Sequence, residues 1–404
     1  MFTLNRQNLS SLLCLLCVAC LPLSWIGSSF GSLFRTMIVL IISAYLIVFR
    51  GKLSINKNNS TLIKAWAIYA VYVSARSFFS ANIESAIYNI LGVCLSFVIA
   101  ILFSTQKFDE VNRKRMVKVW LSVGVISVLL FLLGDRSGIN QYTSRTTLRI
   151  LGSALDPNEF ASIFVIIIPL CASELYRCKR RAYKLFLSLF MIVCLYCVLL
   201  TGSRGALLSV LIALGYLYVK ILKKSFGGFL LVSLFVLIAG FILLEFFFPL
   251  LAPDVVKRFS IEALMMDQGS GRSSLWLEAI NKLIDGSVIN WLFGFAYSGL
   301  RIGSFINMST DTMHNQFVQE LISNGFIGFV LYIYLLVNVY KNMKKYNFIY
   351  LPILIGMICM SLTITMGAQV KQYWFLLMMA FLGEETKEKD NREKEFYYND
   401  RYRK

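Results

Sequence analysis

Hydrophobic and polar positions follow one another along this chain in long blocks, without the short periods that mark the half-buried elements of a soluble domain. The apolar runs, of roughly 15–22 residues, match the roughly 20 residues that cross the hydrocarbon core of a bilayer. On this criterion we expect about twelve membrane-spanning helices. They are predicted at residues 10–27, 34–49, 62–79, 86–103, 119–134, 160–176, 185–200, 206–219, 228–250, 317–340, 348–364 and 370–382.

The longest polar segment, residues 251–316, lies between the ninth and tenth predicted spans and is expected to form a long external loop. Its apolar positions predict an amphipathic helix over residues 273–284, lying on the membrane surface or over the mouth of the helix bundle. The positions that recur at helical spacing are Leu275, Trp276, Ala279, Ile280, Leu283 and Ile284. We expect residues 1–404 to form one membrane-embedded domain, in which residues 383–404 are a charged cytoplasmic tail.

Composition agrees with a membrane protein, because 57% of the residues are hydrophobic, 15% are charged and the mean hydropathy is +0.67. The formal net charge of +18 would suit a nucleic-acid-binding protein, but the basic residues follow the predicted loops. Most of them, including the basic runs at 113–118, 177–184 and 220–224, fall on the side that an even number of spans assigns to both termini. The positive-inside rule makes that side cytoplasmic. The predicted fold class is therefore an all-α polytopic membrane protein with both termini in the cytoplasm, surrounded by membrane lipids and without a nucleic-acid partner.

The basic residues predicted on the outside are mostly arginines. Besides Lys257, Lys282 and Lys371 they are Arg35, Arg76, Arg136, Arg145, Arg149, Arg204, Arg258, Arg272 and Arg301. Topology does not require arginine rather than lysine, whereas the planar guanidinium group binds phosphate oxygens in pairs. We therefore expect a phosphorylated group to be held at the outer face. Snorkelling and contact with lipid headgroups are the alternative for any single arginine.

Metal and triad chemistry find little support. The one histidine, His314, excludes the common zinc sets, and no Asp-x-Asp pair in the predicted external loops suits a divalent cation. No Gly-x-Ser-x-Gly elbow is present. The nine cysteines lie in or at apolar spans, except Cys178 in a basic loop, which indicates packing rather than disulfides. We expect no metal and no other cofactor.

Two stretches place arginines at helix starts. The sequence Thr-Gly-Ser-Arg-Gly-Ala at residues 201–206 predicts a very tight external hairpin that puts Arg204 at a helix end. Residues 269–274 open the amphipathic helix, so Arg272 is expected beside free backbone N–H groups that favour an anion.

Two other stretches are open to a purely structural interpretation. His314 and Asn315 open the tenth span, where a histidine is more often a hydrogen-bonded interface residue than a catalyst. Asp156-Pro157-Asn158-Glu159 is a helix start with Asp156 as N-cap, and capping alone could explain these residues.

In their order and spacing around one long loop, these motifs resemble those of the O-antigen ligase and Wzy-type polymerase family. The resemblance is carried by residues 201–206, by Gly271-Arg272-x-x-x-Trp276, by Gly294-Phe295-Ala296, and by His314-Asn315 followed by Leu321 and Gly325. Asp156-Pro157-Asn158 with Phe160-Ala161 also resembles a segment common in that family.

The resemblance implies metal-independent glycosyl transfer at the outer face of a bacterial cytoplasmic (inner) membrane, from a glycan carried on undecaprenyl pyrophosphate. It implies that Arg204 and Arg272 bind the pyrophosphate and that His314 activates the acceptor hydroxyl. These roles suit the residue types, because arginines stabilise charge on a leaving group and a near-neutral imidazole serves as a general base. A flippase and a chain-length regulator are implied as partners. Secondary, substrate-binding candidates are Arg145, Arg149, Asp156 and Asn315.

The acceptor distinguishes the activities within this family. A polymerase joins one lipid-linked repeat unit to another, whereas a ligase transfers the finished chain to lipid A core. The Asp-Pro-Asn segment and the absence of a large extra domain favour the polymerase. A lipid-linked glycan flippase or other transporter is a third alternative, and it would need ionisable residues at mid-membrane, for which Glu174 and Glu245 are the clearest candidates.

Overall fold

The computed structural model describes residues 6–25, 28–49, 55–80, 82–106, 110–140, 145–150, 153–222, 272–296, 302–305, 308–310, 312–346, 350–367 and 370–382, with isolated positions between 227 and 256. Its helices are α1 (Arg6–Ala19), α2 (Ser28–Phe49), α3 (Ser60–Ser77), α4 (Ile83–Ser104), α5 (Glu110–Leu133), α6 (Pro157–Arg177), α7 (Arg181–Leu200), α8 (Arg204–Leu222), α12 (Arg272–Ile284), α13 (Val288–Phe293), α14 (Gln316–Tyr346), α15 (Leu351–Ser361) and α16 (Lys371–Met378). Short 3₁₀ helices lie at Leu21–Trp25, Lys57–Asn59 and Met379–Phe381.

The helical, polytopic architecture expected from hydropathy is confirmed. Among the described residues, five helices are long and apolar enough to cross a membrane, and further apolar helices are shorter. Every predicted span coincides with a helix except 228–250, which lies outside the described residues apart from isolated positions. The predicted cytoplasmic tail, 383–404, and most of the region between 251 and 271 also lie outside them.

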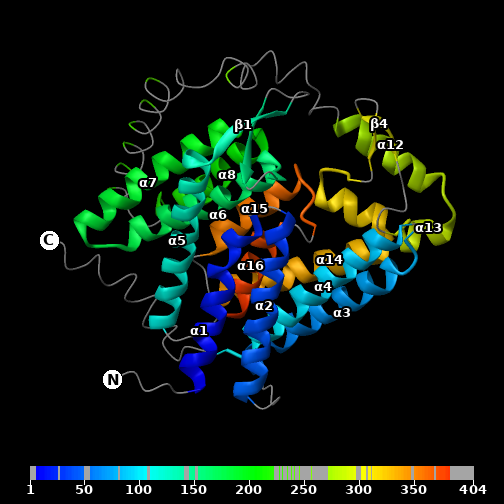
Figure 1. The fold of residues 1–404 in the computed structure, drawn as a ribbon, viewed down its shortest axis with the longest axis horizontal. Coiled ribbons are helices and arrows are strands. Elements are labelled where there is room, and N and C mark those ends of the chain that lie inside the picture. Colours follow the sequence, from blue (N-terminus) through cyan, green and yellow to red (C-terminus); the bar gives the residue numbers. More distant parts are fainter. Residues whose placement is uncertain are drawn as a thin grey trace.

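The spans predicted at 348–364 and 370–382 are shorter than expected. Helix α15 has 11 residues and α16 has 8. At 1.5 Å per residue these are about 16 and 12 Å long, so neither crosses a hydrocarbon core of about 30 Å by itself. Figure 1 shows both helices in the middle of the bundle, with α6 and α8 on one side and α3, α4 and α14 on the other.

The core is built around α6 and the last two helices. Residues Phe160 to Leu170 of α6 are buried, and so is every residue of α16 after Lys371. A helix that is apolar all round is stable only when other helices enclose it. Helices α6 and α16 are therefore held firmly in the bundle, and so are the segments attached to their ends.

Two small antiparallel sheets, not predicted from the sequence, lie in the two loops expected outside. The first has the order β1 (Asp135–Asn140), β2 (Arg145–Ile150) and β3 (Ser153–Ala154), and the second pairs β4 (Ile302–Phe305) with β5 (Met308–Thr310). Both lie along the upper edge of Figure 1, as does α12.

Candidate active site

Arg204 stands at a tight hairpin, as predicted. Helix α7 ends at Leu200, Thr201 caps it, and Gly202 adopts a left-handed φ of 61° that few residues other than glycine tolerate. Helix α8 then begins at Arg204 itself. The chain reverses within three residues, which fixes the start of α8 relative to the end of α7.

The first turn of α8 packs against residues 362–367, the segment that connects α15 to α16 and that we call the 362–367 turn. At Gly205 an added Cβ atom would lie 2.8 Å from the Cβ of Thr363 and closer still to its hydroxyl. Only a glycine allows this approach. The backbone at the start of α8, directly after Arg204, is thereby held next to Thr363.

Arg272 reaches the same residue from the loop that the sequence predicts to be external. Its Nη1 donates a 2.5 Å hydrogen bond to the backbone carbonyl of Thr363, and it is the first residue of α12. The start of α8, at Arg204, and the guanidinium group of Arg272 therefore both lie at this turn, and each arginine is the first residue of its helix. A cation there opposes the helix dipole, whereas an anion is stabilised both by the dipole and by the N–H groups.

One turn further along, α12 fixes the residue before His314. Trp276 Nε1 donates to the carbonyl of Met313 at 2.7 Å, and the N–H of Met313 donates to Gln319 Oε1 at 2.9 Å. His314 then has a φ of 49°, a left-handed conformation that is uncommon for a residue with a side chain. Asn315 caps α14 by accepting hydrogen bonds from the N–H groups of Phe317 and Val318.

The apolar face of α12 decides between its two expected positions. Leu275, Ala279 and Leu283 are buried, and they form a small core with Met313 and Ile322 at the start of α14. Residues 273–284 are helical, as predicted, and of the two alternatives the packing supports the mouth of the bundle. Burial of these side chains, in addition to the hydrogen bonds donated by Arg272 and Trp276, keeps α12 against α14.

A glycine pair joins the loop to α14. Gly325 (φ 67°) interrupts the helix, and the N–H groups of Phe295 and Ala296 bind the carbonyls of Ile322 and Ser323 at 2.8 and 2.9 Å. A Cβ on Gly294 would lie 2.5 Å from the nitrogen of Gly325. The Gly-Phe-Ala motif thus occupies carbonyls that a continuous helix would have used itself.

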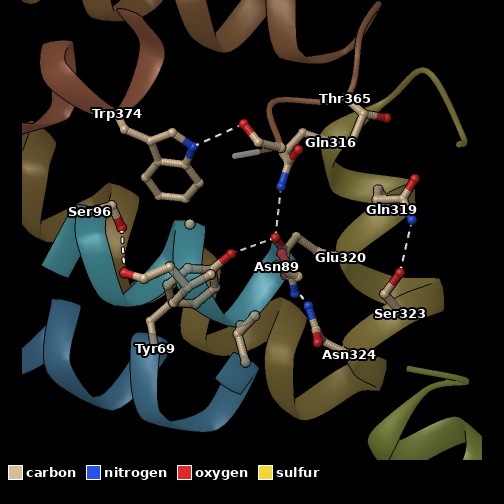
Figure 2. Close-up of a pocket in the computed structure, with 14 residues that line it drawn as sticks. Tyr69, Asn89, Ser96, Gln316, Gln319, Glu320, Ser323, Asn324, Thr365 and Trp374 are labelled. Carbon is tan, nitrogen blue, oxygen red and sulfur yellow. Dashed lines mark hydrogen bonds between the residues drawn. The ribbon is translucent and has the colours of Figure 1, made fainter. Parts of the chain in front are cut away.

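Helix α14 carries a buried polar cluster, which the sequence-based selection of site residues missed. Glu320 accepts hydrogen bonds from Tyr69 Oη, Gln316 Nε2 and Asn324 Nδ2 at 2.6–2.7 Å (Figure 2). Gln316 Oε1 in turn accepts from the N–H of Met366, in the 362–367 turn. Polar residues at 316, 319, 320, 323 and 324 share one helix face, and this spacing inside a predicted span was the available signal.

The remaining candidates from the sequence, Asp156, Arg145 and Arg149, have no described contact with the 362–367 turn. Asp156 Oδ1 caps α6 by accepting from the N–H groups of Asn158 and Glu159, as the capping interpretation predicted. Residues 145 and 149 lie in β2, where their Cα partners in β1 are Asn140 and Asp135, and their side chains lie outside the description. No contact described here joins any of these residues to the 362–367 turn.

Two outward arginines have structural partners. Arg76 Nη2 donates to the carbonyl of Gly294, and its guanidinium lies 5.2 Å from the centroid of Phe79. Arg35 lies over the ring of Tyr88. Arg76 and Arg35 therefore have structural contacts, and phosphate binding by the other arginines predicted outside stays a prediction. Within the described spans, the clearest buried carboxylate is Glu320 and not Glu174, the candidate from the sequence. Glu174 forms an ion pair with Arg177 at 3.8 Å.

Comparison with protein families bears on this geometry directly, because residues 189–333 match the family model described as O-Antigen ligase. Over these residues the chain is similar to an O-antigen ligase domain. The matched segment includes the hairpin of Arg204, all of α12, the Gly294–Gly325 contact and His314, whereas Thr363 and Asp156 lie outside it. Enzymes with an O-antigen ligase domain transfer lipid-linked glycans. The comparison with curated proteins gave no match.

Proposed function

We propose that this protein polymerises oligosaccharide repeat units carried on undecaprenyl pyrophosphate, at the outer face of a bacterial cytoplasmic membrane. The observation that carries the proposal is that the first turn of α8, which begins at Arg204, and the guanidinium group of Arg272 both lie against Thr363. A helix start with an arginine as its first residue, beside a second guanidinium group, suits a dianionic group such as pyrophosphate.

In the proposed reaction a hydroxyl of the acceptor attacks the anomeric carbon of the donor glycan. The new glycosidic C–O bond forms as the bond from that carbon to the pyrophosphate oxygen breaks, and undecaprenyl pyrophosphate leaves. Arg204 and Arg272 stabilise the negative charge that develops on the leaving oxygen. His314 accepts the proton of the attacking hydroxyl. No metal is invoked, because the sequence offers one histidine and no external Asp-x-Asp pair.

The polymerase is favoured by the Asp156-Pro157-Asn158 segment, which resembles a segment common in the O-antigen ligase and Wzy-type polymerase family. The ligase is the second candidate, because the matching family model is described as O-Antigen ligase. Both would use the same leaving group and base, and they differ only in the acceptor. A flippase and a chain-length regulator are the partners proposed for the polymerase.

The deciding experiment supplies purified protein in liposomes with one polyprenyl-pyrophosphate-linked repeat unit isolated from the producing strain, without added divalent metal. A ladder of longer glycans is the expected product. Transfer that occurs only after lipid A core is added would make the protein a ligase. Absence of product in both assays, with correctly inserted protein, would overturn the glycosyltransferase proposal in favour of a transporter.

A further inference from the structure

A small cavity lies beside Glu320, between α3, α4, α14 and the 362–367 turn. Its volume is about 40 Å³, and its lining includes Tyr69, Asn89, Glu320, Thr365 and Trp374 (Figure 2). A cavity of this size has room for roughly three water molecules or for a few ligand atoms. Its position in the span that begins at Gln316 makes a polar lining costly unless the lining has a use.

The carboxylate of Glu320 has capacity for one more donor. Its side chain is 4% exposed, and three neighbouring groups donate to its two oxygens. A carboxylate offers about four lone-pair positions, so one is left. Among the residues that the structure describes, no lysine, arginine or histidine forms an ion pair with Glu320.

Thr365 and Trp374 add two different kinds of contact. Thr365 is 6% exposed, and its buried hydroxyl has no hydrogen-bond partner among the residues that the structure describes. Trp374 is oriented by hydrogen bonds from Nε1 to the carbonyls of Met366 and Gly367, which leave its indole ring against the cavity (Figure 2). The lining therefore combines an acceptor, a group that both donates and accepts, and a flat apolar surface.

This combination selects a class of ligand. A cation would need several free oxygens, yet most of the capacity of Glu320 is already used by N–H and O–H donors. An anion would be repelled by the carboxylate. A hydroxyl group donates and accepts at once, and a carbon ring packs on an aromatic face, so a sugar fits all three contacts.

The cavity is also connected to the arginine site. Gln316 bonds both Glu320 and the N–H of Met366, and Met366 follows Thr363 by three residues. Three residues of chain span at most about 11 Å. The groups that line the cavity are thus held close to the carbonyl that Arg272 binds, on the side of the turn that faces α14.

We propose that this cavity binds the hydroxyl-bearing edge of one sugar of the lipid-linked glycan, with Glu320 and Thr365 as its hydrogen-bonding residues. The inference rests on the proposed function and adds to it a specificity subsite. The cavity admits one edge of a ring and not a whole oligosaccharide, so the remainder of the glycan lies outside it.

Thr365→Val is the decisive variant, because it removes a hydroxyl that has no partner among the described residues. A buried polar group without a partner costs stability, so the variant should unfold at the same temperature as wild type or higher. The KM for the polyprenyl-pyrophosphate-linked repeat unit should nevertheless rise about tenfold, the loss expected for one hydrogen bond, with kcat within twofold of wild type. Glu320→Gln, which keeps the shape but loses an acceptor, should raise KM by at least as much.

Ser173→Ala provides the matched control, because Ser173 Oγ is also buried without a partner but lies near the opposite end of α6. It should leave KM unchanged. Wild-type KM in Thr365→Val, while the wild-type protein extends the glycan, would overturn the sugar subsite and leave the transferase standing. A wild-type protein that neither polymerises nor ligates the glycan would overturn the proposed function and the subsite with it.

Discussion

Gly205 and Thr363 lie so close together that a side chain on Gly205 would collide with that of Thr363. The contact joins the start of α8, next to Arg204, to the turn whose carbonyl binds Arg272. It spans 158 positions of sequence, from α8 to the turn after α15. The geometry of the proposed pyrophosphate site therefore depends on Gly205, a residue without a side chain.

Gly205→Ala should accordingly damage activity out of proportion to its size. The added methyl group must displace Thr363, which we expect to cost about 1–3 kcal/mol of stability and most of the transfer rate. Thermal unfolding in detergent and glycan ladder formation would measure the two effects. Gly215→Ala, on the same helix with nothing within 4 Å, should be neutral or stabilising by up to about 1 kcal/mol. The double variant Gly205→Ala with Thr363→Gly should recover part of the rate, and an unimpaired Gly205→Ala would contradict this account.

Replacing the arginines tests charge against shape. Arg272→Ala and Arg204→Ala should each lower transfer by about 100-fold or more, since each removes a group proposed to stabilise the leaving pyrophosphate. Arg272→Lys should also be impaired, because an ammonium group cannot both bind the Thr363 carbonyl and present a planar fork to phosphate oxygens. Initial rates in liposomes, normalised to inserted protein, provide the measurement. Arg76→Lys, outside the site, serves as the control for general loss of an outer arginine, and normal rates in either alanine variant would refute the pyrophosphate assignment.

Trp276→Phe isolates the hydrogen bond that orders the residue before His314. The ring remains but the N–H that donates to Met313 is lost, at a cost of about 1 kcal/mol in stability. We expect kcat to fall about tenfold while KM stays near wild type, because the change acts on the position of the base and not on substrate contacts. Trp291→Phe in α13, where the ring stacks on Phe326, should leave kcat unchanged. Equal kinetics for the two variants would mean that Met313 does not position the histidine.

His314→Asn separates the backbone role of this residue from its chemical role. Asparagine tolerates the left-handed backbone found at His314 but cannot act as a base near neutral pH. We expect this variant to fold like wild type and to lose activity as severely as His314→Ala. In the wild-type protein the rate should fall on the acid side of neutrality, where an imidazole base binds a proton, and this limb should be missing from any residual activity of the variants. Full turnover of His314→Asn with an unchanged pH profile would exclude the general-base role.

The parts of the site that the sequence predicts well are those with local chemistry. The hairpin at Arg204 follows from Gly202 and the neighbouring polar residues, and the cap at Asp156 follows from the Asp-Pro-Asn-Glu order. Helix α12 follows from its apolar period. In each case the deciding interactions lie within a few residues of one another, so the pattern contains them.

Other parts depend on contacts between distant segments. Thr363 acts through its backbone carbonyl, which any residue could supply, so its side chain carries no signal for that role. Glu320 lies in a run that is apolar on average, and averaging over the run conceals a polar face that only α3 and the 362–367 turn complete. The strands of the outer loops are short and pair within irregular segments, where hydropathy gives no period to follow.

Helix α12 contacts both parts of the proposed site. Its Arg272 binds the carbonyl of Thr363, at the proposed pyrophosphate site, and its Trp276 binds the carbonyl of Met313, the residue before the proposed base His314. Both bonds come from the same helix, so a displacement of α12 would break them together. If α12 lifts from the bundle, a bound donor would face neither the arginine nor an ordered histidine. Coupling the two parts through one helix avoids a partly assembled site, in which water could hydrolyse the lipid-linked glycan before an acceptor arrives.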